Sequence, residues 1–509
     1  MPIPLIDLFA GPGGLNEGFS SVLDSRGNHV FETALSVEMN EFAHRTLELR
    51  ALYRLLRRNG RPEDYLAYVQ GRMVRDELFK RSGAIGVEAQ SEAMRATMGE
   101  STSTDREIEA RIEGALKRRG GKEFVLIGGP PCQAYSLVGR ARRKHEERVV
   151  FEADPKHRLY EEYLRIVSRF RPAVFLMENV TGLLSARLGG ESMFARIYED
   201  LGDAGYDLHP IDDGGTLPNL TETDPKRFVV RADEHGVPQS RSRVFILGIR
   251  SDLKLKPRAL EVATTTPATI DDVLNGLPEI RSRISRRPDS AQDWSDEIRK
   301  LGNYKFTHLG DAMRNFIRSS LNTINPRLPL GSQFIHAESR PSKLADWLNG
   351  ENVGGVLNHN SRGHMASDLR RYFFWSAYAS IHERSPSLAD VPHHLRPDHK
   401  NVIGDAVDVP FADRFRVQLR GRPSTTVTCH IAKDGHYYIH YDPSQCRSLS
   451  VREAARLQTF PDAYFFEGPV TEQYKQVGNA VPPYLAKQIG GVVHSILSGD
   501  KVPQALAGT

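Results

Sequence analysis

The sequence predicts an α/β protein with a mostly parallel, doubly wound sheet and a second, smaller domain of irregular structure. The first observation is the start of the chain, where an apolar strand (3–9), a glycine-rich turn (10–14), a helix and a second strand (34–37) follow one another. The second observation is that short apolar segments recur at 124–127, 174–177 and 244–249. Strands and helices that alternate in this order are typical of a doubly wound sheet.

Two regions interrupt this alternation. Residues 41–119 are mostly helical in pattern and highly charged, and they are predicted to form an inserted helical segment. Between 251 and 425, proline, arginine and serine dominate and the alternation is lost, which predicts the second domain. We therefore expect a first domain over 1–250, a second domain over 251–425, and a last part, 426–509, that returns to the first domain.

Composition excludes several classes of protein. The chain has 509 residues, with 68 Lys and Arg against 64 Asp and Glu, so any nucleic-acid surface has to be a local patch. Three cysteines exclude a disulfide framework and fit a reducing compartment. No apolar run approaches the roughly 20 residues that span a bilayer. We expect a cytoplasmic protein that has no contact with a membrane.

The glycine-rich turn suits close approach of a ligand at a helix N-terminus. It contains Gly11, Gly13 and Gly14, and Glu38 ends the next strand, where a ribose hydroxyl is commonly bound. Glycines needed only for tight packing explain the turn equally well. A nicotinamide enzyme would look similar, although the G-x-G-x-x-G spacing is absent.

Three further places carry reactive or charged side chains. Cys132 follows two glycines and two prolines at a strand end, where it is either a nucleophile or a small buried apolar side chain. Glu178 also ends a strand, as a proton donor or as a helix cap or ion-pair partner. Arg241 and Arg243 share one face, to clamp an anion or to form a salt-bridged edge.

A group of cysteines and histidines near the C-terminus invites a zinc interpretation. The spacing from Cys429 to Cys446 matches no standard ligand pattern, so no metal site is expected. The segment 425–441 instead predicts a β-hairpin with an Asp-Gly turn at 434–435.

Six blocks in fixed order give the chain a family resemblance. The blocks are Asp-Leu-Phe-Ala-Gly-Pro-Gly-Gly (7–14), Gly-Gly-Pro-Pro-Cys-Gln (128–133), Glu-Asn-Val (178–180), Gln-Ser-Arg-Ser-Arg (239–243), Arg-Glu-Ala-Ala-Arg-Leu-Gln (452–458) and Gln-Val-Gly-Asn-Ala-Val-Pro-Pro (476–483). Together they resemble the cytosine-5 DNA methyltransferase family of bacterial restriction–modification systems. The resemblance covers nearly the whole chain outside 41–119 and 251–425.

The resemblance implies a Rossmann-like methyltransferase domain and a covalent mechanism. In the family, a cysteine at the position of Cys132 adds to carbon-6 of cytosine. Glu178 matches the residue that bonds ring nitrogen 3. Arg243 resembles the arginine at the base carbonyl, and Arg241 the arginine beside the cysteine and a phosphate.

The same resemblance implies S-adenosylmethionine as cofactor. The acid that contacts adenine in the family is obscured here, and Glu100 is preferred to Asp105 for that position. The implied cofactor residues are Phe9, Gly11, Gly13, Gly14, Glu38, Met39, Glu100, Pro130, Asn479 and Val481.

The implied substrate is double-stranded DNA with a flipped-out cytosine, because a stacked base hides carbon-6. A basic loop, 136–148, would close over the DNA, and arginines at 281–287 and 362–371 would add contacts. The DNA contacts singled out are Ser136, Arg140, Arg142, Arg143, Arg362 and Arg370. We expect a monomer on DNA with a cognate restriction endonuclease or defence-system component as partner. The alternatives are a tRNA cytosine-5 methyltransferase of the same fold and a catalytically silent DNA-binding relative.

Overall fold

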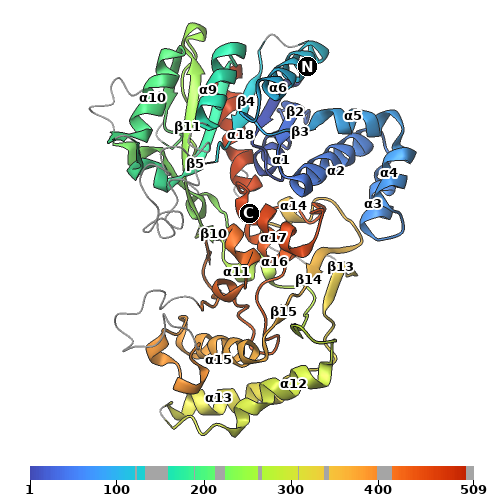
Figure 1. Cartoon of the computed structure of the whole chain (residues 1–509), viewed down its shortest axis with the longest axis vertical. Coiled ribbons are helices and arrows are strands. Elements are labelled where there is room, and N and C mark those ends of the chain that lie inside the picture. Colours follow the sequence, from blue (N-terminus) through green and yellow to red (C-terminus); the bar gives the residue numbers. More distant parts are fainter. Residues whose placement is uncertain are drawn as a thin grey trace. The chain divides into compact units, whose positions relative to one another are not determined.

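The computed structural model describes residues 1–120, 123–131, 159–188, 190–212, 224–261, 266–307, 309–337, 343–397 and 415–499. The chain divides into two compact units, drawn in Figure 1. The sheet unit comprises Met1–Asp64, Arg75–Thr266 and Ala480–Thr509, and the second unit comprises Tyr65–Val74 and Pro267–Asn479.

A mostly parallel sheet organises the sheet unit. Its strand order is β3-β2-β1-β4-β5-β11-β8, and β9 pairs with β11. The first five strands are parallel, whereas β11 runs antiparallel to β5, β8 and β9. This confirms the predicted fold class. The strands are β1 (Ile3–Leu8), β2 (Phe31–Glu38), β3 (Ala93–Arg95), β4 (Val125–Gly128), β5 (Val174–Val180), β8 (Tyr206–His209), β9 (Val229–Arg231) and β11 (Ser242–Arg250).

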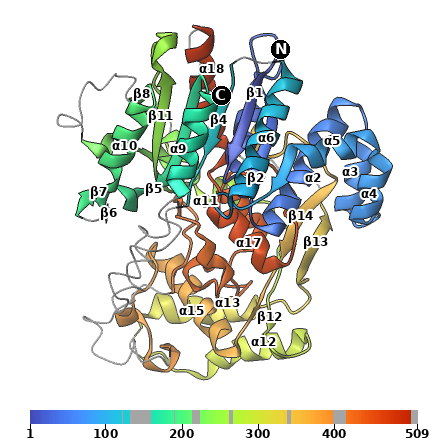
Figure 2. The same ribbon diagram turned by 45° about the horizontal axis from the view of Figure 1, so that its top comes forward.

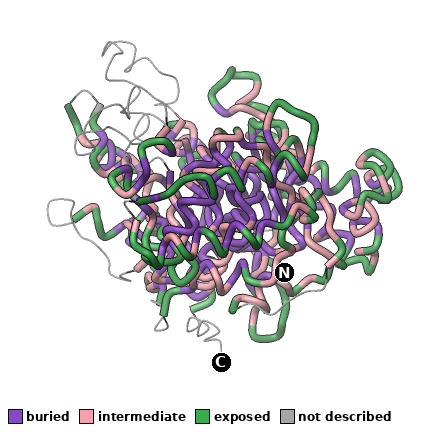
Figure 3. Tube along the Cα trace, turned by 90° about the horizontal axis from the view of Figure 1, so that it is seen from below, coloured by how far each residue is buried: buried purple, intermediate pink, exposed green. Residues whose placement is uncertain are grey.

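Helices cover both faces of this sheet (Figures 1 and 2). Side chains alternate along a strand, so Ile6 and Leu8 of β1 pack with α6, α9 and α10, while Leu5 packs with α1 and α18. The strands are largely buried, and Figure 3 shows that buried residues concentrate in the interior of the trace. The helices of this unit are α1 (Gly14–Ser20), α2 (Glu41–Arg58), α4 (Arg75–Ser82), α5 (Ala84–Glu92), α6 (Thr102–Arg119), α9 (Leu159–Phe170), α10 (Met193–Asp203) and α18 (Pro483–Ser498).

The segment 41–119 differs from the helical insertion that the sequence suggests. It contains β3, which pairs in parallel with β2, and α6, which packs on the sheet core. Only α3 (Pro62–Val69), α4 and α5 are additional to the alternating pattern. The three residues of β3 are too few to produce a periodic signal, which is why the sequence did not reveal this strand.

The second unit is built around an aromatic helix. Tyr372, Phe373, Phe374 and Trp375 of α15 are all buried, which explains this aromatic run as core. From Tyr65 onward, α3 belongs to this unit. The other helices are α11 (Ile270–Leu274), α12 (Ala291–Arg299), α13 (Asp311–Asn322), α14 (Ala345–Leu348), α15 (Ala366–His382), α16 (Val451–Leu457) and α17 (Val470–Asn479), and its strands are β12 (Arg283–Ile284), β13 (Gly331–His336), β14 (Gly355–Asn360), β15 (Gly363–His364) and β16 (Ser424–Thr425).

The C-terminal part also differs from expectation. The chain returns to the sheet unit at Ala480 and not near 426, because α16 and α17 pack within the second unit. The predicted hairpin is wrong, since Cys429–Ala432 and His436–Tyr438 are short 3₁₀ helices. Within the described residues, no three potential metal ligands gather. None of the described helices is long and apolar enough to cross a membrane.

Candidate active site

Two of the predicted segments meet at the point where the strand order reverses. Residues Leu8 and Gly128 are register partners at the ends of β1 and β4. The glycine-rich turn follows β1, and Gly129-Pro130 follows β4, so both leave the sheet at the same edge. In open α/β sheets this switch point is the usual ligand-binding position.

The glycine-rich turn is held in an unusual backbone conformation. Phe9, Gly11 and Gly13 all have left-handed φ angles of 56°, 55° and 89°. Such a φ is disfavoured for an aromatic residue such as Phe9, and strained residues of this kind cluster at functional sites. Apart from its two chain neighbours, no residue that the structure describes has an atom within 4 Å of a Cβ placed on Gly11, so the space beside it is open within the described part of the chain.

Gly14 has a different role from Gly11. A Cβ on Gly14 would come within 2.2 Å of the Val481 carbonyl oxygen, and one on Gly18 would come within 2.4 Å of the Ala486 Cβ. The glycines of α1 therefore permit tight packing of the C-terminal segment. This packing places Val481 beside the glycine-rich turn, where the sequence predicted it.

Glu38 connects the end of β2 to the glycine-rich turn. Its Oε2 accepts a hydrogen bond from the Gly11 N–H (2.8 Å), and its Oε1 accepts one from the Asn40 N–H (2.7 Å). Burial raises the pKa of Glu38, and the bonds from Asn40 and Gly11 oppose that shift. Met39, next along the chain, is 58% exposed and presents an apolar side chain to solvent.

Asp7 is a site residue that the sequence reasoning did not single out. Its side chain is buried, and neither carboxylate oxygen has a hydrogen-bond partner in the described part of the chain. Burial raises the pKa of Asp7 well above its ordinary value, and nearby Glu38 adds to the shift. The signals in the sequence were its place near the end of the first strand and its position as the first residue of the block 7–14.

Both acids considered for the adenine contact follow β3: Glu100 is in the loop, and Asp105 is in the first turn of α6. Asp105 accepts the Gly99 N–H (2.9 Å) and lies 3.6 Å from Nη2 of Arg165. Glu100 is exposed in the loop. Because Asp105 is engaged in local structure, the geometry is compatible with the preference for Glu100.

Glu178 and Arg243 form an ion pair across β5 and β11. The Arg243 Nε lies 3.0 Å from Glu178 Oε1. Burial lowers the pKa of Arg243, and the Glu178 carboxylate opposes this shift. A Cβ on Gly129 would lie 3.0 Å from Glu178 Oε2, and Asn179 Nδ2 donates to the Pro130 carbonyl oxygen (3.2 Å). The pair therefore adjoins the Gly129-Pro130 segment.

Several predicted residues lie outside the described residues or away from these contacts. Arg241 is 2% exposed and precedes β11, and its carbonyl oxygen accepts the Ala232 N–H (2.8 Å). After β4, the described part of the chain ends at Pro131, one residue before Cys132. The predicted residues outside the described ranges are Cys132, Ser136, Arg140, Arg142 and Arg143.

Three predicted residues belong to the second unit. Asn479 is the last residue of α17 and is exposed. The Arg362 guanidinium lies over the Tyr474 ring, 4.3 Å from its centroid. Arg370 instead donates to Glu297 Oε1 (3.0 Å), so its charge is already paired within the unit.

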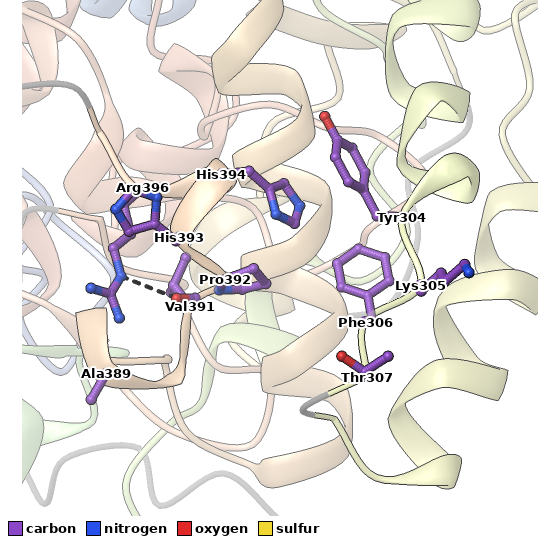
Figure 4. A pocket seen from close by; sticks show the side chains of 10 residues that line it. All are labelled: Tyr304, Lys305, Phe306, Thr307, Ala389, Val391, Pro392, His393, His394 and Arg396. Carbon is purple, nitrogen blue, oxygen red and sulfur yellow. Dashed lines mark hydrogen bonds between the residues drawn. The ribbon is translucent and has the colours of Figure 1, made fainter.

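The second unit also contains a pocket of about 450 Å³ that no predicted site residue lines (Figure 4). Tyr304 and His394 stack there with ring centroids 3.9 Å apart and an interplanar angle of 12°. Phe306 lies below this pair, and the Arg396 Nε donates to the Val391 carbonyl oxygen (3.2 Å). This lining is aromatic and cationic, with no acidic residue.

The similarity to known proteins agrees with this geometry. The model of the C-5 cytosine-specific DNA methylase family matches residues 121–495. The chain belongs to this family. The expected activity, that of a DNA (cytosine-5)-methyltransferase, is thereby confirmed.

Individual relatives extend over most of the chain. A type II methyltransferase of Bacillus paralicheniformis, M.Bpa9945I, is 31% identical over 97% of this chain and 99% of its own length. A DNA (cytosine-5-)-methyltransferase of Aeropyrum pernix, M.ApeKI, is 26% identical over 74% of this chain and 80% of its own. A solved structure of an E. coli prophage protein, described as a DNA modification methyltransferase, shares the fold with a TM-score of 0.53 and 19% identity, over 97% of this chain and 99% of that one.

Proposed function

We propose that this enzyme methylates carbon-5 of a cytosine within a short sequence of double-stranded DNA, through a covalent adduct between Cys132 and carbon-6. The observation that carries the proposal is the Glu178–Arg243 pair beside Gly129-Pro130, just before Cys132. A partly buried acid and arginine next to the position of a nucleophile can bind the polar edge of a cytosine. In this proposal the sheet unit performs the chemistry and the second unit recognises DNA.

The residues at the switch point fit S-adenosylmethionine. The open space at Gly11 admits a ligand, and two buried carboxyls, Asp7 and Glu38, lie close to the turn without a cationic side chain hydrogen-bonded to either. A ligand that carries a sulfonium and an ammonium group would supply the missing positive charge. When bound, it supplies the electrophilic methyl group. The residues proposed to hold it are Phe9, Gly11, Gly13, Glu38, Met39, Glu100, Pro130, Asn479 and Val481.

The proposed roles of the chain's own residues follow from the weak nucleophilicity of carbon-5 of cytosine. This carbon is a weak nucleophile until the Cys132 thiolate adds to carbon-6. Glu178 gives a hydrogen bond or a proton to ring nitrogen 3 and relieves the negative charge, while Arg243 orients Glu178 and reaches the base carbonyl. By the family resemblance, Arg241 is proposed to contact the cysteine and a DNA phosphate. After methyl transfer, carbon-5 loses its proton to a base and the cysteine leaves with its electron pair.

The proposed setting is a type II modification system in the cytoplasm. The Bacillus relative and several others are named type II methyltransferases. These names support the proposal of a cognate restriction endonuclease as partner. We propose that the enzyme acts as a monomer. It needs the target base flipped out of the helix, because a thiol cannot reach carbon-6 within the stack.

Bisulfite sequencing of DNA from a methylation-free host that expresses the chain tests the proposal. Methylated cytosine in one short context is expected, and it should be absent with Cys132→Ser, which should still bind the cofactor. Unmodified DNA from a folded, cofactor-binding enzyme would contradict the proposal, and transfer RNA would then be assayed as the substrate.

A further inference from the structure

An exposed turn of the second unit carries three arginines within five residues. Arg283 begins β12, and Arg286 and Arg287 follow in the turn; all three are exposed. None of them forms an ion pair or a side-chain hydrogen bond with another residue that the structure describes. Like charges this close along the chain repel one another where salt does not screen them. We call these three residues the arginine turn.

Both ends of the arginine turn are tied to the core of the unit. Arg281, 5% exposed, donates two hydrogen bonds to the Asp289 carboxylate, at 2.8 and 2.6 Å. These bonds hold the pKa of Asp289 below its ordinary value. Ser282 accepts a bond from the buried Trp294 (3.1 Å) and donates to the Cys446 carbonyl oxygen (2.9 Å). The turn is therefore held at a defined place in the unit.

The backbone of the turn favours a residue other than arginine. Arg286 has a φ of 63°, in the left-handed region, where a side chain costs roughly 1 kcal/mol or more relative to glycine. On the neighbouring strand β15, by contrast, a glycine occupies the paired position: Gly363 pairs with Arg283. A Cβ on Gly363 would lie 3.3 Å from Arg283 Cγ. Glycine thus leaves room for the Arg283 side chain. Arg362 directly precedes this glycine.

Other arginines in the same region are already neutralised. An arginine that is paired within the fold has less charge to offer a ligand. The internal pairs are Arg281–Asp289, Arg370–Glu297 and Arg371–Asp368. The arginine turn differs from these in having exposed guanidinium groups with no ion pair or side-chain hydrogen bond among the described residues, although the charge of Arg283 also helps to lower the pKa of Asp289.

We propose that Arg283, Arg286 and Arg287 bind phosphate groups of the DNA backbone. This inference rests on the proposed function, because the DNA substrate is the ligand. A planar guanidinium suits a phosphodiester, and a rigid turn binds it at lower entropic cost than a free loop. Phosphate contacts fix the register of a protein on DNA and carry no sequence information. The arginine turn therefore positions the second unit on DNA and leaves base recognition to other residues.

The salt dependence of DNA binding by the full chain tests the inference. Log affinity should fall with log salt concentration less steeply after replacement of all three arginines by alanine, by about 0.9 for each phosphate that the variant no longer neutralises. The loss of affinity should be the same for cognate and unrelated duplexes. Arg318→Ala, in α13, is the control, because Arg318 is exposed and has no ion pair in the described chain.

A second variant separates binding from folding. Arg286→Gly removes one charge and relieves the left-handed backbone, so its thermal stability should match or exceed that of the wild type. Its salt slope should still fall by about 0.9. An unchanged slope in both variants, with DNA methylated normally by the wild type, would overturn this inference alone. Absence of methylation and of DNA binding by the wild type would overturn the proposed function with it.

Discussion

Buried carboxyl groups are treated differently in the two units. At the strand ends of the sheet unit, the hydrogen-bond donors to Glu38 in the described chain are backbone N–H groups. The Asp7 carboxylate has no hydrogen-bond partner in the described chain. In the second unit, Glu453 forms two bonds with Arg447 (2.6 and 2.7 Å), and His440 lies 3.4 Å away. Burial would raise the pKa of Glu453, but Arg447 and His440 outweigh it and hold the pKa well below normal.

This difference separates a structural acid from an acid available to a ligand. Glu453 is neutralised from within and also caps α16 through Ser450. Asp7 and Glu38 keep a burial penalty that a bound cation would relieve. We therefore expect Asp7 and Glu38, which have no hydrogen-bonded cationic side chain in the described chain, to lie at the proposed cofactor site.

The largest expected effect is loss of the internal pair. Arg447→Met leaves Glu453 as an uncompensated buried charge and should lower the free energy of unfolding by about 3–5 kcal/mol. Denaturant titration of the variant and the wild type measures this loss of unfolding free energy. The matched control is Arg420→Met, whose exposed pair with Asp271 should cost at most about 1 kcal/mol. Similar losses in both variants would remove the distinction between the units.

A smaller effect is expected from the two glycines of the turn. Gly14→Ala meets the Val481 backbone oxygen and should destabilise the chain by about 1–3 kcal/mol, because backbone must shift. Gly11→Ala has open space and only the cost of its left-handed φ, roughly 1 kcal/mol. Thermal unfolding compares them. Gly11→Ala should weaken cofactor binding more than its stability loss explains, and equal affinity to the wild type would contradict its role.

Glu38→Gln should affect binding more than folding. The amide cannot accept both backbone bonds in the same way, and it removes the negative charge offered to the ligand, so S-adenosylmethionine affinity should fall about tenfold or more. Calorimetric titration measures this change. Unfolding free energy should change little, since the buried charge is also removed. Unaltered affinity would exclude Glu38 from the cofactor site.

The smallest expected effect is a pH dependence with opposite signs in the two units. The raised pKa of Asp7 gives stability that is present below its unfolded value, about 3.9, and lost as pH rises through the folded pKa. The lowered pKa of Glu453 gives stability that is present above about 4.3 and lost as pH falls. Asp7→Asn should therefore gain stability relative to the wild type as pH rises from about 4 to about 8. If the unfolding free energies of Asp7→Asn and the wild type changed in parallel with pH, this would contradict the raised pKa of Asp7.

Short local patterns predicted much of the sheet unit correctly. Five apolar segments correctly predicted the existence of β1, β2, β4, β5 and β11, because a buried strand leaves a run of apolar residues in the sequence. The three-residue β3 and the unit boundary at Ala480 left no such run. Both depend on pairing and packing with distant segments.

The sequence by itself determined the family, the α/β class and the positions of Glu38, Glu178 and Arg243 at strand ends, because these lie in local blocks whose order is covalent. Only the tertiary structure decided which polar groups are paired. Asp7 is left without a partner in the described chain, while Arg370 is neutralised by Glu297, 73 residues away along the chain. Burial and ion pairing depend on which segments meet in space, and no local pattern of residues specifies that.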